Sequence, residues 1–430
     1  MKRTIGIGLL GLGTVGSGVA DVLATKADSL AEQAGLPLVL KKVLVRHLNK
    51  RRSAKVSRNL LTSYPEEVLS HPEVDIVIEL IGGEHPATEY IERAIASGRH
   101  VVTANKEVMA KHGYELFSLA RKHNADLRYE ASVGSGIPLI SSFQQDLAAN
   151  KISAIHAILN GTTNYILTRM AQEELDFAST LKQAQKLGYA EANPANDIEG
   201  IDAAYKLVIL SNLAFQAKFV PRDVYHEGIS NISARDFLYA REFGYAIKLL
   251  AIAKRDDGKV EMRVHPVFIP DDSQLAKVDG VYNAVEVDTD LAGKLVFYGE
   301  GAGALRASSA VVADVLAIAR NICCSVTSVP ELRLDERIDV KPMAEVTSRY
   351  YLRLDAPDRP GVLSQISRVL GDNSISISSV IQKESDLTEQ TATIVIMTYP
   401  AKEKGMQKAL KQLKRLPEVN EVSNFIRVEG

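Results

Sequence analysis

The chain has 430 residues, more than the roughly 100–200 of a typical single domain, so the sequence predicts two or three domains. Apolar residues make up 46% and charged residues 24%, which is typical of a globular protein rather than a disordered, fibrous or membrane-spanning one. With 51 Lys and Arg against 53 Asp and Glu, the charge favours small-molecule partners over nucleic acid or an anionic membrane.

Three features bear on the cellular compartment. The first residues pair two basic side chains with an apolar run, as a signal peptide does, but glycines interrupt the run and we interpret it as a first strand. No apolar run reaches the length of about 18 residues that a membrane helix needs. Cys323 and Cys324 are adjacent, where a disulfide would be strained, so we expect ordinary core thiols. A cytoplasmic protein is predicted.

Short β-branched runs alternate with helical patterns over the first third of the chain, which predicts a parallel α/β sheet. The expected strands are 4–10, 38–45, 75–81, 100–103 and 127–132. Between residues 150 and 300 the pattern changes to strands at 152–159, 245–253 and 261–268 mixed with helices such as 201–216, which indicates a separate α+β domain.

The last third predicts a long helix at 302–322, a polar connector, and a tail that reads strand, helix, strand, strand, helix, strand. That order is typical of a ferredoxin-like βαββαβ unit. The predicted domains are therefore 1–145, with 302–330 packing back on it, then 146–301, a linker at 331–348, and 349–430.

A glycine-rich loop follows the first strand and opens a helical run, 17–31. It reads Gly11, Leu12, Gly13, Thr14, Val15, Gly16, which is the dinucleotide-binding fingerprint of a Rossmann domain in its required context. Gly11 would make the tight turn, Gly13 would let the backbone approach the pyrophosphate, and Gly16 would allow close helix packing. The alternative is a glycine-rich turn with no ligand.

Basic residues follow the second strand, where an acidic residue would bind the ribose of NAD. The strand ends at Val45 and is followed by Arg46 and His47, with further cations at 50–52. These suit a 2′-phosphate and favour NADP, with Arg46 as the main contact. A solvated basic loop is the alternative, and NAD stays possible.

Residues 184–206 predict a helix end, a turn and a second helix. Gly188 would cap the first helix, and Asn193 and Pro194 would force the turn. Asp202 and Lys206 are spaced i,i+4 and can pair. A surface ion pair would be the simplest explanation, but their helix is otherwise strongly apolar, which indicates that the pair lines a cleft.

The same segment resembles the signature of homoserine dehydrogenases, A-x3-G-aromatic-small-x2-N-P-x2-D-x-x-G-x-D-x3-K, and matches it at every fixed position. The resemblance extends over the whole chain. It includes residues 102–106 (VTANK), 130–138 (EASVGSGIP), 160–166 (NGTTNYI) and 299–304 (GEGAGA).

The resemblance implies reversible hydride transfer between L-homoserine and L-aspartate 4-semialdehyde, in threonine, methionine and isoleucine biosynthesis. Lys206 would donate the proton to the carbonyl oxygen, Lys106 would lie between nicotinamide and substrate, and Asp202 would orient Lys206 and the substrate. Glu191 would bind the substrate ammonium group. Further residues implied are Asp197, Tyr189 and Thr162 for the substrate, and Thr103, Lys106, Gly188 and Gly303 for the cofactor.

The resemblance also implies a monovalent cation, with sodium as the expected ion, held by the loop 130–137. Its ligands would be main-chain oxygens of Val133, Ser135 and Ile137 with the Glu130 oxygen, because hard oxygens suit such an ion. A glycine-rich loop that merely connects two domains is the alternative.

One departure from the family pattern lies after Gly303. The family usually continues Gly-x-x-Pro-Thr-Ala-Ser, whereas this chain has Arg306 and Ala307 in place of the proline and threonine. The start of the following helix and its cofactor contacts are therefore in question.

The C-terminal tail carries a strand-to-helix turn, residues 355–363 (DAPDRPGVL), that resembles the signature turn of ACT domains. Pro360 suits a first helical turn and Gly361 permits close approach. The resemblance implies a homo-oligomer and feedback control by an amino acid, with threonine expected, although a purely structural dimerisation role stays open. An amino-acid-sensing regulatory protein on a dehydrogenase scaffold is the alternative to an enzyme; all four polar residues of the expected site, Lys106, Glu191, Asp202 and Lys206, are present and favour the enzyme.

Overall fold

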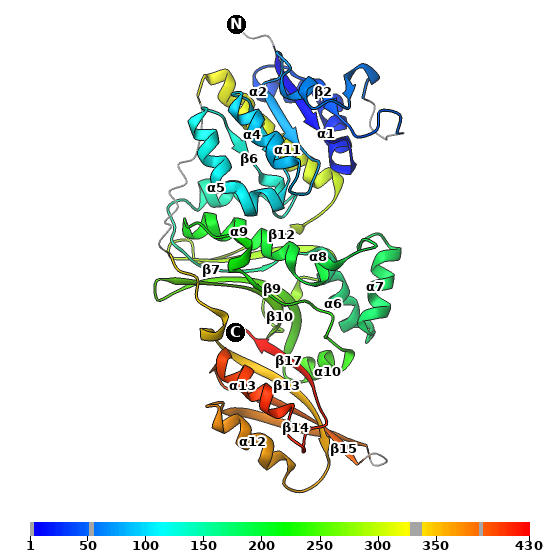
Figure 1. Ribbon diagram of the computed structural model, residues 1–430, viewed down its shortest axis with the longest axis vertical. Helices are drawn as coiled ribbons and strands as arrows, with labels where there is room; N and C mark the ends of the chain where they lie inside the picture. The colour runs from blue at the N-terminus through cyan, green and yellow to red at the C-terminus, as the bar shows by residue number, and fades with distance from the viewer. Residues whose placement is uncertain (1–3, 51–55, 327–337, 387–389) are drawn as a thin grey trace. The chain divides into compact units, whose positions relative to one another are not determined.

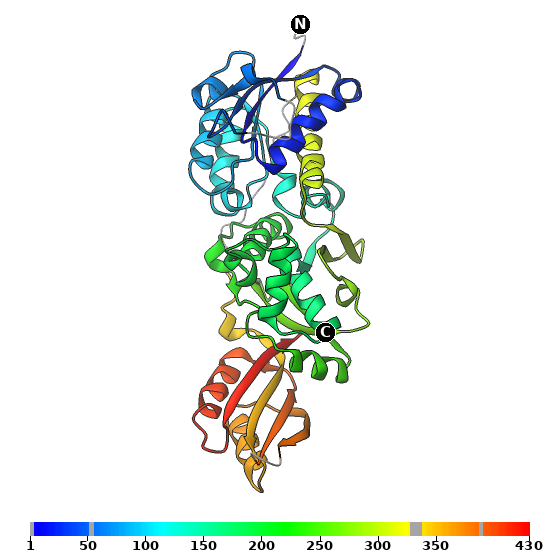
Figure 2. The same cartoon turned by 90° about the vertical axis from the view of Figure 1, so that its right-hand side faces the viewer.

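The computed structural model describes residues 4–50, 56–326, 338–386 and 390–430. It divides into two compact units (Figures 1 and 2). The first unit comprises residues 1–152, 205–222 and 287–337, and the second comprises 153–204, 223–286 and 338–430. The cations predicted at 51–52 and residues 331–337 of the predicted linker lie outside the described residues.

The first unit is built on a six-stranded sheet in the order β3-β2-β1-β4-β5-β6, with every neighbouring pair parallel. Its strands are β1 (Ile5–Leu10), β2 (Leu38–Leu44), β3 (Leu61–Thr62), β4 (Ile76–Glu79), β5 (His100–Thr103) and β6 (Leu127–Arg128). The predicted parallel Rossmann-type sheet is confirmed, because its buried strands bear helices as crossover connections.

The helices of the first unit connect these strands. They are α1 (Thr14–Thr25), α2 (Ala27–Ala34), α3 (Glu66–Leu69), α4 (Ala87–Ala96) and α5 (Lys106–Lys122), together with α11 (Ala304–Cys324); the strand β12 (Lys294–Glu300) also belongs to this unit. The single helix expected over 17–31 is in fact two, because the backbone leaves the helical conformation at Lys26. That bend lets Leu30 and Ala34 join the same core as Leu23.

The helix α11 returns from late in the chain to the first unit, as predicted, and lies beside α1 (Figure 2). Val311, Val315 and Ile318 are fully buried at i, i+4 and i+7 and share a core with Ile5 and Ile7 of β1. Among the described residues, α11 is the one helix with the length and apolar composition of a membrane span, and half of it is buried inside the structure. Its packing is that of a core helix.

The second unit contains a mixed sheet in which neighbouring strands run β7-β9-β10-β17-β13-β15-β14. Its strands are β7 (Ile152–Ile158), β8 (Tyr225–His226), β9 (Tyr245–Asp256), β10 (Lys259–Pro270), β11 (Tyr282–Thr289), β13 (Thr347–Pro357), β14 (Ile377–Asp386), β15 (Thr391–Thr398), β16 (Ala401–Lys402) and β17 (Glu421–Val428). Its helices are α6 (Gly161–Glu173), α7 (Phe177–Lys186), α8 (Ala195–Ile198), α9 (Ile201–Phe215, which continues into the first unit), α10 (Ala234–Glu242), α12 (Val362–Asp372) and α13 (Glu403–Leu413).

The C-terminal module, residues 347–428, has the predicted order of strand, helix, strand, strand, helix, strand, with the two-residue strand β16 added before α13. It has its own core, in which Leu352, Ile366 and Met406 are fully buried. Its last strand, β17, pairs antiparallel with β13 and also parallel with β10 of the preceding sheet (Figure 1). Residues 339–341 also hydrogen-bond to Val260 at the start of β10. The module therefore shares a continuous sheet with the rest of its unit.

Two local predictions are wrong. Cys323 and Cys324 are exposed free thiols rather than core thiols, because they fall in the last turn of α11, beyond its buried stripe; Cys323 donates to the Ala34 carbonyl over 3.2 Å. The strand expected over 127–132 stops at Arg128 and gives way to a turn of 3₁₀ helix, η2 (Glu130–Ser132), because the N–H groups of Ser132 and Val133 bond back to the carbonyls of Tyr129 and Glu130 instead of to a neighbouring strand.

Candidate functional site

The glycine loop joins β1 to α1 in a conformation that demands its glycines. Gly11 has a φ of +100°, and a Cβ there would lie 2.8 Å from the Leu80 carbonyl oxygen. A Cβ on Gly16 would lie 2.1 Å from the carbonyl oxygen of Gly11. Gly13 caps α1, and a Cβ there would meet nothing within 4 Å, so this side of the loop is open to a ligand. The first N–H groups of α1 can therefore meet a phosphate.

A cavity of about 490 Å³ opens beside this loop. Its lining includes Gly11 and Gly13, and also Arg46, His47 and Lys50 from the segment after β2. Among the described residues that line it, none is Asp or Glu. Arg46 is exposed, so its guanidinium can reach an anionic group without losing a buried partner.

The start of α5 carries one of the two predicted lysines. Lys106 is the first residue of α5, directly after the N-cap Asn105, whose side chain accepts from the Val108 N–H over 3.2 Å. Thr103 is fully buried at the end of β5, and its hydroxyl accepts from the Asn105 N–H over 3.0 Å. The Thr103 hydroxyl also donates to the Glu79 carboxylate over 2.6 Å, so both of these bonds are to the protein itself.

The residues expected to bind substrate gather around Asn160, the N-cap of α6. Its side-chain amide donates to Asp197 over 2.7 Å and to Asp202 over 2.8 Å, while its oxygen accepts from the Thr163 N–H over 2.9 Å. Asn160 thus brings together two acids that lie five residues apart in sequence. Sequence reasoning did not assign Asn160, although an Asn directly after a strand and before a helix signals a cap.

The turn before α8 is held to α6 at a second point. Thr162 donates its hydroxyl to the Tyr189 carbonyl over 2.6 Å, and the rings of Tyr165 and Tyr189 lie 4.8 Å apart. Gly188 has a φ of +80° and ends α7, as predicted. Glu191 is exposed in this turn, where its carboxylate is accessible to a cationic ligand.

Asp202 and Lys206 lie one turn apart in α9, with exposed fractions of 2% and 9%. Charged side chains are seldom buried unless they are partnered, so this pair does not belong to a solvated face. The helix that carries Lys206 is also close to α5: the Lys111 ammonium lies 5.8 Å from the ring of Tyr205, the residue before Lys206.

The loop predicted to hold a cation is shaped by the Glu130 carboxylate. Its two oxygens accept from the N–H groups of Leu139, Ile140 and Ser141 over 2.7 to 2.8 Å. Gly134 and Ser135 both adopt positive φ, which turns the loop back on itself. Because the carboxylate already accepts three N–H groups, the main-chain oxygen of Glu130 is the more available of its oxygens for a cation.

The departure at Arg306 does not prevent the late helix from forming. Gly303, with a φ of +128°, caps α11, which begins at Ala304. Arg306 forms an ion pair with Glu300. A Cβ on Gly136 would lie 3.1 Å from the Arg306 Cβ, so this side chain borders the cation loop. The start of α11 also lies near the glycine loop, since Ser308 donates to the Val15 carbonyl over 3.3 Å.

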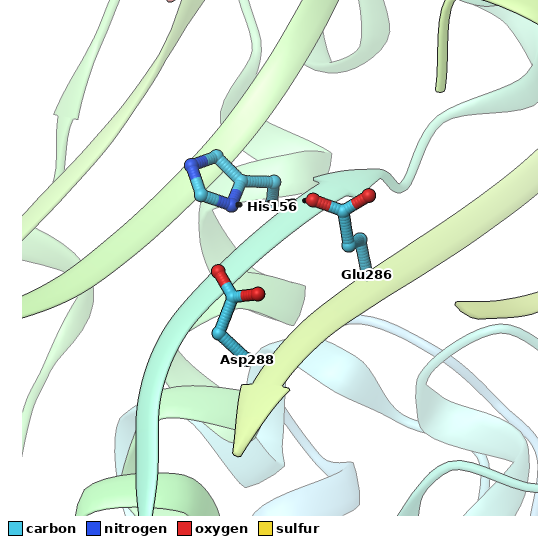
Figure 3. A group of neighbouring side chains, drawn as sticks. All are labelled: His156, Glu286 and Asp288. Atoms are coloured by element: carbon cyan, nitrogen blue, oxygen red, sulfur yellow. Dashed lines mark ion pairs between the residues drawn. The ribbon is translucent and has the colours of Figure 1, made fainter. Parts of the chain in front are cut away.

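A further group of titratable side chains comprises His156 on β7 and Glu286 and Asp288 on β11 (Figure 3). Such side chains can bind a divalent cation. His156 lies 3.9 Å from Glu286 and 3.9 Å from Glu429, and Lys254 lies 2.6 Å from Glu429. Asp288 also lies 3.4 Å from Lys294. The group therefore belongs to a wider set of neighbouring charged side chains, and we describe it as a charge network.

Arginine and carboxylate pairs also join the C-terminal module to the rest of its unit. Arg427 of β17 reaches Glu403 over 2.6 Å and Glu227 over 2.8 Å. Arg353 of β13 pairs with Asp236 of α10 over 2.9 Å. Each arginine is almost fully buried, so the partner carboxylates are required to balance its charge.

Comparison with known proteins agrees with this architecture. Family models match residues 11–130 as the NAD-binding domain of homoserine dehydrogenase, 138–316 as homoserine dehydrogenase and 350–418 as an ACT domain. The homoserine dehydrogenase of Neisseria gonorrhoeae is 42% identical over 433 aligned residues, covering 100% of this chain and 99% of the relative. That of Bacillus subtilis is 38% identical with the same coverage.

Solved structures show the same likeness. The crystal structure of a homoserine dehydrogenase from Thiobacillus denitrificans has a TM-score of 0.93 at 42% identity, covering 99% of this chain and 98% of that one. A hyperthermophilic archaeal homoserine dehydrogenase in complex with NADPH has a TM-score of 0.62 at 27% identity and covers 73% of this chain and 97% of that one.

Proposed function

Because the chain belongs to the homoserine dehydrogenase family of oxidoreductases, we propose that it interconverts L-homoserine and L-aspartate 4-semialdehyde with NADP as its preferred cofactor. The observation that carries the proposal is the buried pair Asp202 and Lys206 on one face of α9, with Asp202 tied to Asp197 through Asn160. A cytoplasmic enzyme of threonine, methionine and isoleucine biosynthesis is the corresponding cellular role.

The reaction needs a proton at the carbonyl oxygen as the aldehyde is reduced. The bound nicotinamide supplies the hydride. Lys206 donates the proton to the oxygen, and Lys106 stabilises the developing negative charge from the start of α5. Asp202 orients Lys206. Asp202 and Asp197 also accept hydrogen bonds from the substrate. Glu191 binds the substrate ammonium group. The turn at Tyr189, which contributes to substrate binding, is fixed by the hydrogen bond from the Thr162 hydroxyl to the Tyr189 carbonyl.

The decisive experiment follows NADPH oxidation with L-aspartate 4-semialdehyde. We expect turnover by the wild-type chain and a loss of about 10²- to 10⁴-fold in kcat for Lys206→Ala, the usual contribution of a general acid. No turnover with either NADPH or NADH would contradict the proposed reaction. Full activity of Lys206→Ala would contradict only the role of this lysine.

The preference for NADP rests on the cations that line the cofactor cavity. Arg46, His47 and Lys50 face a cavity whose described lining holds no acid, and an archaeal relative was solved with NADPH. A 2′-phosphate would gain charge-assisted hydrogen bonds there. Arg46→Ala is expected to raise KM for NADPH about tenfold or more and leave KM for NADH nearly unchanged. Equal effects on both would contradict the assignment.

A monovalent cation, with sodium as the proposed ion, would be held by main-chain oxygens of Glu130, Val133, Ser135 and Ile137. The support is a loop turned by two positive-φ residues and pinned by the Glu130 carboxylate. Initial rates in NaCl against tetramethylammonium chloride at equal ionic strength test it. Equal rates and equal thermal midpoints in both salts would contradict the ion's role.

Feedback control would act through the C-terminal module of a homo-oligomer, with threonine as the proposed effector. Gly361 caps α12 in the left-handed conformation, at the turn that resembles the ACT signature. Titrated L-threonine is expected to lower the rate and raise the thermal midpoint. If it changed neither, threonine control would be excluded.

A further inference from the structure

A carboxylate that the proposed chemistry does not use lies fully buried at the end of β4. Glu79 has an exposed fraction of 0%, and its oxygens accept three hydrogen bonds from the protein itself. Burial raises the pKa of Glu79, and those hydrogen bonds oppose the shift. A buried acid without a cationic partner costs stability, so its presence needs a reason other than packing.

One oxygen of Glu79 fixes the loop that follows its own strand. Its Oε1 accepts from the N–H of Ile81 over 2.7 Å and from the N–H of Gly82 over 3.3 Å. Leu80 and Ile81 line the cofactor cavity, and the Leu80 carbonyl contacts the turn at Gly11. The carboxylate therefore holds one wall of that cavity in place.

The other oxygen fixes the neighbouring crossover. Its Oε2 accepts from the Thr103 hydroxyl over 2.6 Å, and the same hydroxyl accepts from the Asn105 N–H. Asn105 in turn donates its side-chain amide to the Gly83 carbonyl over 2.7 Å and caps α5. These hydrogen bonds form a closed ring, which runs from Glu79 on β4 to Thr103 on β5, on to Asn105, and back to the loop after β4 at Gly83.

The ring lies where the reacting half of a dinucleotide belongs. In this sheet order, the strands on the β4 side of β1 carry the second mononucleotide, the nicotinamide half, at their carboxyl ends. Lys106 is the next residue after Asn105. Any shift in the ring moves both the loop beside the nicotinamide and the first residue of α5.

We propose that Glu79 is a positioning residue for hydride transfer, which fixes the loop 80–83 and the start of α5 relative to each other. It holds the loop through the N–H groups of Ile81 and Gly82, and it holds the start of α5 through Thr103 and Asn105. The inference rests on the proposed function, because it takes Lys106 as part of the reacting site. A carboxylate suits the task, since it offers acceptors to all three donors, whereas an isosteric amide has one acceptor oxygen and two N–H donors.

The test is Glu79→Gln, with Asp126→Asn as its matched control. Asp126 is 1% exposed and accepts from Asn321 over 2.9 Å. It directly precedes β6, at the amino end of that strand, whereas Glu79 lies at the carboxyl end of β4 in the same parallel sheet. Both variants replace a buried carboxyl by its amide. The measurements are kcat, KM for each substrate, thermal midpoint, and the primary isotope effect with NADPH deuterated at the transferred position.

We expect Glu79→Gln to lower kcat about 10- to 100-fold and to increase the isotope effect, because a displacement of about 1 Å at reacting groups costs that much. KM for the aldehyde should change less than kcat, and Asp126→Asn should keep wild-type kcat and isotope effect. A purely structural role would lower the thermal midpoint of Glu79→Gln and leave kcat per folded molecule unchanged.

A second variant keeps the inference testable if Glu79→Gln does not fold. Thr103→Val breaks only the arm toward Asn105 and should give a smaller fall in kcat with the same rise in the isotope effect. Wild-type kcat and isotope effect in Thr103→Val or Glu79→Gln, or an equal fall in Asp126→Asn, would overturn the proposal. Inactivity of the wild-type chain would instead overturn the proposed function itself.

Discussion

Two buried carboxylates of the first unit accept hydrogen bonds from backbone N–H groups, whereas two of the second unit pair with arginines. Glu79 and Glu130 each hold two or three N–H groups of a nearby loop. Asp236 and Glu403 instead face Arg353 and Arg427. The first arrangement shapes loops beside the candidate cofactor and cation sites, whereas the second joins the C-terminal module to α10 through Arg353 and holds α13 to β17 inside the module through Arg427.

The difference also appears in protonation. Burial raises the pKa of Asp314, which accepts from the Glu130 N–H, to about 7. Burial alone would also raise the pKa of Glu429, but Arg263 and Lys254 outweigh it and lower the pKa to about 2. These two carboxylates should therefore contribute to stability with opposite dependence on pH.

The largest expected effect comes from breaking an arginine pair. Arg427→Leu leaves Glu403 and Glu227 without their buried cation and should lower the free energy of unfolding of the second unit by about 3–5 kcal/mol. Chemical denaturation followed by far-UV circular dichroism measures it. Arg368→Leu, which removes an exposed ion pair with Asp372, is the control and should change the value by less than about 0.5 kcal/mol.

Comparable losses for both arginines would erase the contrast between buried and exposed pairs. An Arg427→Leu variant as stable as the wild type would contradict the prediction in the same way, because the buried pair would then contribute no more than the exposed one.

A smaller effect is expected for Asp314, whose pKa is shifted in the opposite direction to that of Glu429. The raised pKa of Asp314 means that its contribution to stability is fully present below about pH 3.8 and is lost as pH rises to about 7, at on the order of 1 kcal/mol per pH unit. Asp314→Asn should remove that slope and match or exceed the wild type at pH 8. Thermal midpoints from pH 5 to 8 measure it, and parallel profiles for the two proteins would refute the assignment.

The smallest effect is expected where a first-unit carboxylate does have a cationic partner. Lys41 lies 3.2 Å from Glu73, which is 66% exposed. Lys41→Met should change the free energy of unfolding by less than about 1 kcal/mol. A larger loss would show that the presence of a cationic partner, rather than burial, determines how much a carboxylate contributes to stability.

Local patterns predicted the elements better than the contacts between them. The parallel sheet, the burial of Asp202 and Lys206 on an apolar helix, and the βαββαβ tail all follow from periodicities that lie within one segment. The roles of Glu79 and Asn160 do not, because each depends on donors brought together by tertiary structure. The pairing of β17 with β10 joins residues about 160 positions apart, which no local pattern encodes.

The shared strand β17 affects how a deletion of the C-terminal module would have to be interpreted. A chain shortened before residue 347 would lose β17 along with the module, and the edge of β10 near Val267 and Phe268 would be left without a neighbour. Bare strand edges recruit other chains and aggregate, and Arg263 would also lose Glu429. If such a truncated chain were insoluble, the cause would be the exposed edge of β10, and the result would give no information about regulation. Substitutions within the module are therefore the better test of whether it regulates the enzyme.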